Sequence, residues 1–368
     1  MKRAWHRDGG NQGPTGPDDE VGGIGHACPA AAPEAISQAG LRGTPMDLAS
    51  ETQARDAVVR RLRLHATRIR RDVVDMVTEA QSGHIGGSLS AADIVAALFF
   101  HHMRHDPADH RWPDRDRYVQ SKGHACPVLY SALAQAGYIE HDEIRTFRKM
   151  DSRLQGHPCK AKLPYLEYTT GSLGQGLSGA LGMALAARLD KNDFRVYCLM
   201  GDGEQQEGQI WEAAMAAAHY EADNLIGILD RNGLQIDGAT EEIMALGDIG
   251  AKYEAFGWHV IPIDGHDPDA ILDALIAADA AAGHGKPVLI LAHTVKGKGV
   301  SFMEGSISFH GRPCTPDEYA IASEELRITR EDAERALHDA GEPVPPVGRE
   351  GVTARQRKPA ARTQEAPA

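Results

Sequence analysis

Two oxygen-bearing side chains have the spacing that a site for a metal ion and a diphosphate requires. Asp202 lies between two glycines directly after the apolar run 195–200, and Asn232 follows a second apolar run, 225–230. Each run is rich in strand-forming residues, and the pattern after the Gly-Asp-Gly turn is helical. Because parallel strands end at one edge of a sheet, beside helix amino termini with free N–H groups, we expect Asp202 and Asn232 to lie close together there.

The expected metal ligands are all oxygens. The carboxylate of Asp202, the side-chain amide of Asn232 and the backbone carbonyl of Leu234 form the kind of set that magnesium prefers, with calcium as the alternative. Gly201 and Gly203 let the backbone approach the phosphates. A lone Gly-Asp-Gly is usually a plain turn, so the prediction depends on strand, helix, strand and asparagine occurring in this order.

Four histidines lie beside glycine or another small residue, which is compatible with loops where the backbone passes close to a ligand. They are His84, His124, His157 and His310. Imidazole titrates near neutral pH and can donate or accept a proton, so it suits a site that handles hydroxyl groups. The chain has 18 histidines, however, and any one of these four taken alone is more simply a surface or core residue.

Two further loops could meet a ligand. Gly171–Gly176 is a glycine-rich turn before a small-residue helix expected at 176–189. It invites a dinucleotide-binding interpretation, but it lacks the directly preceding strand that such a site needs. Thr294–Gly299 contains Lys296 and Lys298, which could meet phosphate or could lie on a solvated loop.

The elements that must position these residues alternate between strand and helix. Further strands are expected at 259–263 and 287–294, with a helix at 269–281 between them. Such alternation predicts an α/β fold with a parallel sheet covered by helices on both faces. No linker-like stretch interrupts residues 60 to 325, so we predict one large domain over residues 51–330.

Two helical patterns lie near the amino-terminal end of the predicted domain. Residues 55–80 carry apolar residues at helical spacing among arginines, which indicates a long amphipathic helix with a solvated basic face. Ser90 and Asp93 have the pattern of a capping box that opens a helix over 94–100.

Composition limits the function classes. The 368 residues carry a formal net charge of −13, which argues against a general binder of nucleic acid or acidic membranes. No apolar run approaches the roughly 20 residues of a membrane span, and no signal peptide is evident. Five cysteines without a Cys-x-x-Cys pair favour reduced thiols and a cytoplasmic location.

The two ends differ from the middle. Residues 1–50 are rich in Gly, Pro and Ala without lasting periodicity, which predicts a disordered extension or a start at Met46 rather than Met1. Residues 341–368 are expected to be a disordered tail for the same reason.

The segments Gly201–His219 and Asn224–Gly238 resemble the thiamine diphosphate motif of transketolases. The likeness runs from about Arg60 to about Leu326 and is greatest to the amino-terminal subunit of split transketolases, in which two chains share the work of one enzyme. It implies the thiamine diphosphate-binding fold. It also implies transfer of a two-carbon ketol unit between sugar phosphates, with thiamine diphosphate and Mg2+ as cofactors.

The resemblance assigns roles to particular residues. His84 and His310 would bind substrate and assist proton transfer, and His157 would contact the donor sugar. Glu207 would support the cofactor or an interface, although it could equally be an ordinary first-turn helix glutamate. Contacts to the cofactor would come from His124, Gly171, Ser172, Leu173, Gly201, Gly203, Glu204, Asn232 and His310.

In the family, a glutamate of a second, pyrimidine-binding domain activates the cofactor. We expect this glutamate to come from a partner, the carboxyl-terminal transketolase subunit, in an assembly with two copies of each chain. Three alternatives stay open: an alpha-type subunit of a 2-oxo-acid dehydrogenase or synthase, a non-catalytic cofactor-binding subunit, and a nucleotide-binding redox protein. Pro158-Cys-Lys160 and Gly305–Phe309 depart from the family pattern on the substrate side, which leaves the donor sugar open.

Overall fold

The computed structural model describes residues 48–328. The expected disordered tail at 341–368 and almost all of the extension expected at 1–50 lie outside these residues. Within 48–328, no helix is both long and apolar enough to cross a membrane.

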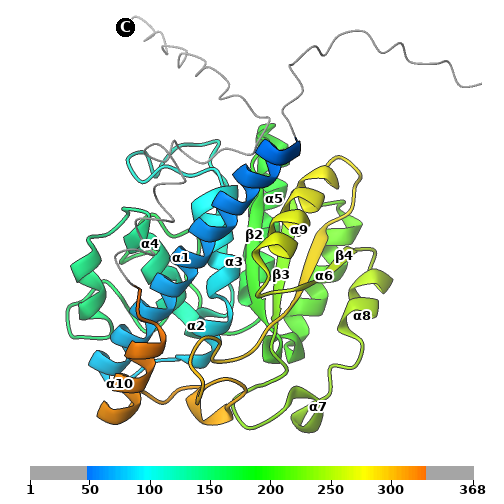
Figure 1. Ribbon diagram of the computed structural model, residues 1–368. Coiled ribbons are helices and arrows are strands. Elements are labelled where there is room, and N and C mark those ends of the chain that lie inside the picture. Colours follow the sequence, from blue (N-terminus) through cyan, green and yellow to red (C-terminus); the bar gives the residue numbers. More distant parts are fainter. Residues whose placement is uncertain (1–47, 329–368) are drawn as a thin grey trace, which may run out of the picture. The chain divides into compact units, whose positions relative to one another are not determined.

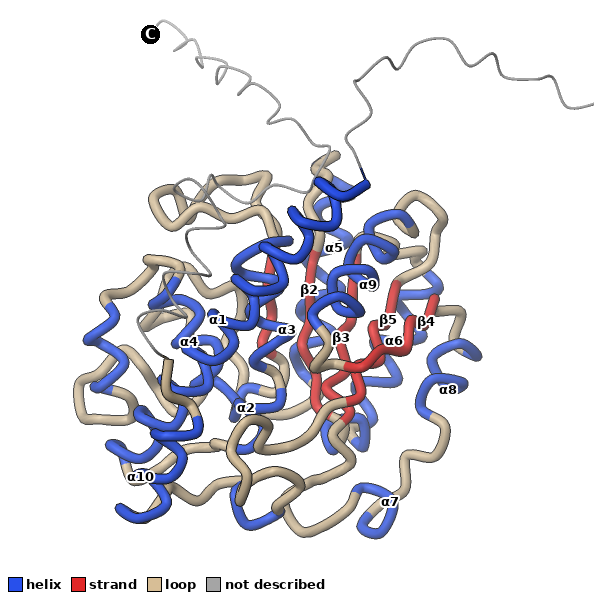
Figure 2. The backbone as a smooth tube through the Cα atoms, in the orientation of Figure 1, coloured by secondary structure: helices blue, strands red, loops and turns tan. Residues whose placement is uncertain are grey.

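A five-stranded, wholly parallel sheet organises the described residues (Figure 2). Its strand order is β1-β2-β3-β5-β4. The strands are β1 (Arg117–Gln120), β2 (Val196–Gly201), β3 (Leu225–Arg231), β4 (His259–Asp264) and β5 (Val288–His293). The four predicted strands are present with ends shifted by a few residues, and β1 was not predicted. The predicted fold class is confirmed.

Helices cover the sheet on both faces (Figure 1). One core includes residues of α1 (Leu48–Ala80), α3 (Ala92–Ala97), α4 (Cys126–Gln135) and α9 (Pro268–Ala280). The other includes residues of α5 (Gln175–Asp190), α6 (Gly208–His219) and α8 (Ile249–Ala255). The remaining described α-helices are α2 (Gly86–Ser90), α7 (Thr240–Ile243) and α10 (Pro316–Glu325).

The interior strand β2 shows why a strand covered on both faces is almost wholly apolar. Tyr197 and Leu199 belong to the first core, whereas Cys198 and Met200 belong to the second. All of β2 is buried, because successive side chains point to opposite faces and both faces are covered.

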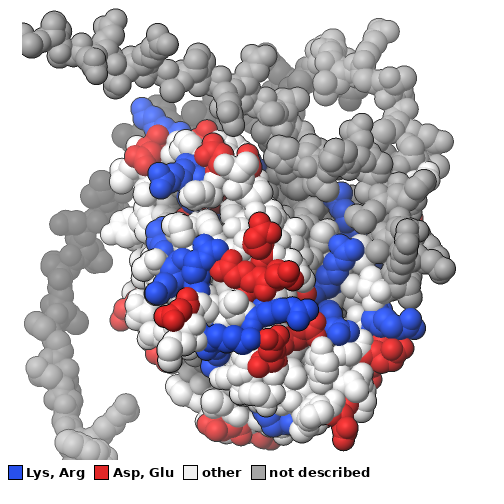
Figure 3. Space-filling model, turned by 90° about the vertical axis from the view of Figure 1, so that its left-hand side faces the viewer, with Lys and Arg blue, Asp and Glu red and all other residues white. Residues whose placement is uncertain are grey.

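The long helix α1 forms as predicted, but its arginine-rich face is not simply solvated. Arg55 Nε donates to Asp269 Oδ1 of α9 over 2.7 Å. Arg70, only 8% exposed, pairs with the buried Asp93. On the face drawn in Figure 3, basic and acidic groups are likewise interleaved among the described residues. The arginines therefore join α1 to its neighbours.

The predicted capping box at Ser90 is wrong. Ser90 is the last residue of α2, and Ala91 precedes α3 without any side-chain cap. Ser90 Oγ instead donates to Asp230 Oδ2 over 2.6 Å, and Asp93 Oδ2 binds His266 Nδ1 over 2.8 Å. Both segments are buried, so distant polar partners replace the local cap.

Candidate functional site

A cavity of about 350 Å³ lies at the carboxyl edge of the sheet, beside the ends of β2 and β3. Most of the predicted site residues line it: His84, His124, Gly171, Leu173, Gly201, Asp202, Gly203, Glu204, Glu207, Asn232, Leu234 and His310. His157 and Ser172 do not line it. The fold thus brings together residues from segments that are far apart in the sequence.

Asp202 is held by the backbone turns around it. Its Oδ1 accepts from Gly203 N over 2.9 Å and its Oδ2 from Gly233 N over 2.5 Å. Arg231 also donates to Oδ2, over 3.2 Å. Burial and then the Asp230 carboxylate raise the pKa of Asp202 despite these donors. A cation beside this carboxylate would favour its ionised form, because it would offset both effects.

Asn232 and Leu234 lie in the turn that follows β3. Asn232 Oδ1 accepts from Leu234 N over 3.2 Å, and Gly233 between them has a φ of +77°, which glycine adopts without strain. No cluster of three or more His, Cys, Asp or Glu side chains suited to a metal occurs within residues 48–328. The predicted set of one carboxylate, one amide and one carbonyl does not need such a cluster, and its oxygens fit Mg2+.

Glu204 joins three turns of the site. This residue is 2% exposed, and Oε1 accepts from Ser121 Oγ over 2.5 Å and from Gly174 N over 2.9 Å. Oε2 accepts from Gly201 N over 3.0 Å. Glu204 therefore fixes the loops that line the cavity. Glu207 is exposed at the position preceding α6, so it is not inside the first turn of that helix.

The four predicted histidines form one cluster. The ring centroid of His84 lies 5.1 Å from that of His124, 5.3 Å from that of His310 and 6.5 Å from that of His157. His124 and His310 are stacked at 5.4 Å. His84 Nδ1 is buried and has no hydrogen-bond partner among the described residues. Three of the four residues, His157 being the exception, line the cavity.

Burial keeps these imidazoles neutral at neutral pH. It lowers the pKa of His84 to about 4, with Arg148, His157 and Lys296 acting in the same direction. It lowers the pKa of His310 to about 3, assisted first by Lys296. The pKa of His124 falls well below its usual range for the same reason. A neutral imidazole can accept a proton or a hydrogen bond from a hydroxyl group.

Two lysines also line the cavity: Lys122, which was not predicted, and Lys296, for which a phosphate contact and a solvated loop were both left open. Lys122 Nζ donates to Gly87 O over 2.9 Å and forms a buried ion pair with Asp230. Lys296 Nζ lies 2.8 Å from His310 Nδ1. Lys296 is 2% exposed, so the solvated alternative for its loop is wrong at this position, whereas Lys298 pairs with Glu304 over 3.3 Å. Gly87, Gln206, Gln235 and Ile236 also line the cavity.

A signal for some of these residues was present in the sequence. Lys122 lies in the same Ser-Lys-Gly-His stretch as His124, and Gln235 directly follows Leu234. No local pattern indicated that Lys122 would pair with Asp230, because the two lie in different strand-loop units.

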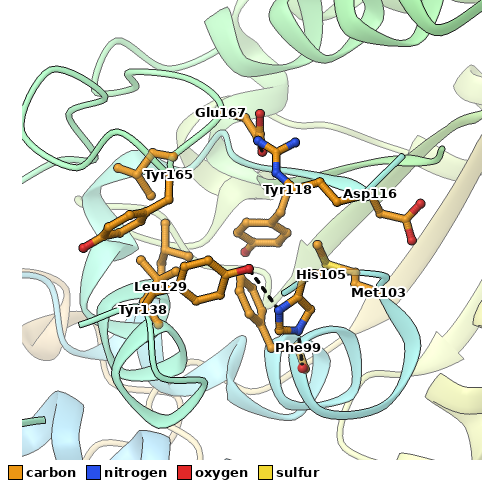
Figure 4. Close-up of a pocket in the computed structure, with 12 residues that line it drawn as sticks. Phe99, Met103, His105, Asp116, Tyr118, Leu129, Tyr138, Tyr165 and Glu167 are labelled. Atoms are coloured by element: carbon orange, nitrogen blue, oxygen red, sulfur yellow. Dashed lines mark hydrogen bonds and ion pairs between the residues drawn. The ribbon is translucent and has the colours of Figure 1, made fainter. Parts of the chain in front are cut away.

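A second, smaller pocket of about 40 Å³ lies beside β1 and α4 (Figure 4). His105 occupies its wall, with Nδ1 3.1 Å from Tyr138 Oη and Nε2 2.7 Å from Phe99 O. Both ring nitrogens therefore have partners. A space of this size holds about one water molecule, and we interpret the pocket as structural.

The likeness of this chain to known proteins agrees with the geometry of the cavity. Residues 62–334 match the family model described as "Transketolase, thiamine diphosphate binding domain". The chain belongs to the transketolase family. It is 44% identical over 265 residues to a 6-deoxy-6-sulfo-D-fructose transketolase subunit of a Clostridium species, with 72% of this chain and 96% of that relative covered.

Two other relatives agree. One of the subunits of the apulose-4-phosphate transketolase of Phocaeicola vulgatus is 43% identical over 277 residues, with 75% of this chain and 98% of that relative covered. The solved transketolase of Campylobacter jejuni superposes with a TM-score of 0.69 at 35% identity. That match covers 76% of this chain and 47% of the solved one. This transketolase-family chain therefore spans nearly the whole of two relatives named as subunits and about half of a solved transketolase.

Proposed function

We propose that this chain is one half of a two-chain transketolase that moves a two-carbon ketol unit between sugar phosphates. The observation that carries the proposal is a single cavity that joins the oxygen ligands of Asp202, Asn232 and Leu234 to the cluster of neutral histidines. The first group suits Mg2+ and a diphosphate, and the second suits hydroxyl groups.

Asp202, Asn232 and Leu234 would hold Mg2+ and the anionic part of thiamine diphosphate. Lys122 and Lys296 add positive charge to the same cavity. Gly171 and Leu173 line the cavity and would contact the ring portion, whereas the exposed Ser172 would reach it only through its backbone. Bound thiamine diphosphate supplies a carbon nucleophile, which protein side chains lack.

Proton handling falls to His84 and His310. His84 lines the cavity, where its neutral imidazole would meet a substrate hydroxyl. His310 Nδ1 faces Lys296, which leaves Nε2 for substrate. His124 stacks on His310 and would hold its plane. His157 lies outside the cavity lining and would contact the donor sugar at its mouth.

A carboxyl-terminal transketolase subunit is the proposed partner, with two copies of each chain. Support comes from the relatives named as subunits and from the rim of the cavity. Ile236 lines the cavity and is 59% exposed. Met244 is 58% exposed, and Gln206 Nε2 donates both to its carbonyl and to the side chain of Gln235, the residue before Ile236. A partner would cover these apolar groups and supply the activating glutamate. Glu207, exposed at the cavity wall, would lie at that interface.

We propose a cytoplasmic location for this chain. Cys126, Cys159, Cys198 and Cys314 are free thiols, which a reducing compartment maintains.

The test is co-expression with candidate carboxyl-terminal subunits, followed by a ketol-transfer assay with thiamine diphosphate and Mg2+. The donor panel should include xylulose 5-phosphate, apulose 4-phosphate, 6-deoxy-6-sulfo-D-fructose, pyruvate and a branched oxo acid. Transfer from a sugar donor by the pair, and not by either chain alone, supports the proposal. Activity only with pyruvate or a branched oxo acid would favour the dehydrogenase or synthase alternative.

A further inference from the structure

Arg148 lies outside the cavity lining, but its side chain contacts the loop that carries His84 and the loop that carries His157. One terminal nitrogen donates to Ser82 Oγ over 2.8 Å, and the other donates to Gly156 O over 3.3 Å. Ser82 is two residues before His84, and Gly156 directly precedes His157. One guanidinium group therefore bridges two segments that are otherwise distant in the sequence.

The packing around the bridge leaves little freedom. A Cβ added at Gly156 would lie 2.8 Å from Arg148 Nε and 2.9 Å from its Cζ, so only glycine lets the guanidinium approach so closely. The guanidinium also lies over the ring of Phe147, 5.5 Å from its centroid. That ring packs against Gly83, where an added Cβ would lie 3.0 Å from Phe147 Cε1. Both histidine loops thus contact the Phe147–Arg148 pair.

The backbone of Arg148 adds a third connection. Its N–H donates to Leu154 O over 2.9 Å, and its φ of +57° is one that side-chain-bearing residues seldom adopt. Tyr130 supports the same loop from another side, because its hydroxyl lies 2.8 Å from Gln155 O and 3.2 Å from His157 O. These bonds reach only the His157 loop, which makes Tyr130 a natural control.

We propose that Arg148 is a positioning residue that fixes the separation of His84 and His157 and keeps a permanent positive charge beside both rings. The catalytic meaning of this role rests on the proposed function, since it assumes that the two histidines handle substrate. The bridge itself does not depend on that assumption.

The charge of Arg148 acts on both imidazoles. After burial, it is the next cause that lowers the pKa of His84 and that of His157. His84 also faces His157, Lys296, His124 and His310. Arg148 is thus the charged group shared by the two rings, and its removal should favour protonation of both.

The experiment separates geometry from charge by histidine NMR titration of the full chain without cofactor, substrate or partner. Arg148→Gln removes the charge, and we expect the titrations of His84 and His157 to shift upward together. Arg148→Lys keeps the charge but not the planar fork, so the shift should be smaller while the bridge is still lost. Tyr130→Phe should leave the titration of His84 unchanged.

The active pair gives a second readout. Arg148→Gln should lower kcat/KM about tenfold, through both a higher donor KM and a lower kcat, because small misplacements of positioned groups are costly. Arg148→Lys should recover part of kcat. If Arg148→Gln does not fold, Ser82→Ala tests the proposal, because it removes only the contact of Arg148 with the His84 loop. We expect it to alter the titration of His84 and not that of His157.

Unchanged titrations of both histidines in a folded Arg148→Gln or Ser82→Ala chain would overturn the proposal. Because these titrations require no catalysis, altered titrations in the variant chains together with a wild-type pair that transfers no ketol unit would support the bridge and refute the proposed function instead.

Discussion

Lys296 Nζ and His310 Nδ1 lie 2.8 Å apart in the wall of the cavity. Burial, and then the charge of Lys122, lower the pKa of Lys296 to about 8, and burial and Lys296 lower the pKa of His310 to about 3. At neutral pH the ammonium of Lys296 therefore donates to a neutral imidazole, which fixes the tautomer of His310 with its proton on Nε2.

This pair predicts an alkaline limit on activity. Raising the pH through about 8 removes the proton of Lys296, so the fixed donor to His310 and a positive charge in the cavity are lost. We expect kcat/KM of the active pair to fall above this pH. Because the His310 pKa is about 3, His310 should contribute no acid limb near pH 6.5. The pH dependence of kcat/KM for wild type and Lys296→Met tests this, and an unchanged alkaline limb in the variant would refute it.

Acid should destabilise the fold through its buried histidines. His65, His84 and His101 each have a pKa lowered to about 4, first by burial, whereas an unfolded histidine titrates near 6.5. Between these values the unfolded chain binds more protons than the folded one, so stability falls as the pH drops from about 6.5 to about 4. Urea unfolding midpoints across this range check the sign.

His65 offers a single-site version of that test. Its ring stacks on Phe100 at 3.7 Å, away from the cavity, and its Nδ1 contacts Gln135. His65→Gln should lower stability at neutral pH through lost stacking but flatten the decline with acid. A decline as steep as in the wild type would show that His65 does not contribute.

Removing the carboxylate of Asp202 should abolish the effect of Mg2+ on cofactor binding. A ligand at about 100 times its dissociation constant stabilises a protein by about 2.7 kcal/mol, and Asp202→Asn should lose most of that stabilisation. Thermal unfolding with thiamine diphosphate, with and without Mg2+, measures it. Asp264→Asn is the matched control, since Asp264 is an exposed aspartate at the end of β4 on the same sheet edge. Equal losses in both variants would contradict the assignment.

The buried ion pair between Lys122 and Asp230 should be costly to break from one side. Burial opposes the charge of Asp230, but Lys122, Ser90 and Thr294 bind the carboxylate and lower its pKa overall. Asp230→Ala leaves Lys122 without its counter-ion and should cost about 3–5 kcal/mol. Urea unfolding measures the loss.

The double variant Lys122→Met/Asp230→Leu removes both charges and is the comparison for that loss. It should be less destabilised than Asp230→Ala, because no buried charge remains uncompensated. A double variant that is less stable than Asp230→Ala would mean that packing, and not charge, dominates at this position.

Local patterns in the sequence predicted the strands that precede Asp202 and Asn232, because each strand is an apolar run followed by a distinctive turn. They missed β1, which has only four residues and no long apolar run. They also failed at Ser90, whose hydroxyl donates to Asp230, 140 residues away in the sequence, instead of capping a helix. Contacts of this kind depend on how the strands are ordered in the sheet, which single-sequence periodicity does not specify.

The histidine cluster could also be predicted only in part from the sequence. Their residue types and glycine neighbours suggested loops near a ligand, and the resemblance grouped them. His157 lies outside the cavity lining, and the hydrogen bonds of Arg148 to Ser82 and Gly156 join its loop to that of His84, a contact that no spacing indicated.

Glu204 has a consequence for how this transketolase-family chain could diversify. Because one carboxylate anchors the turns at Ser121, Gly174 and Gly201, a change in any of them disturbs all three. Single substitutions in these three turns should therefore be selected against. New donor or acceptor preferences would therefore arise more readily at Gln235–Ile236 and around Pro158–Lys160, which lie outside this shared anchor.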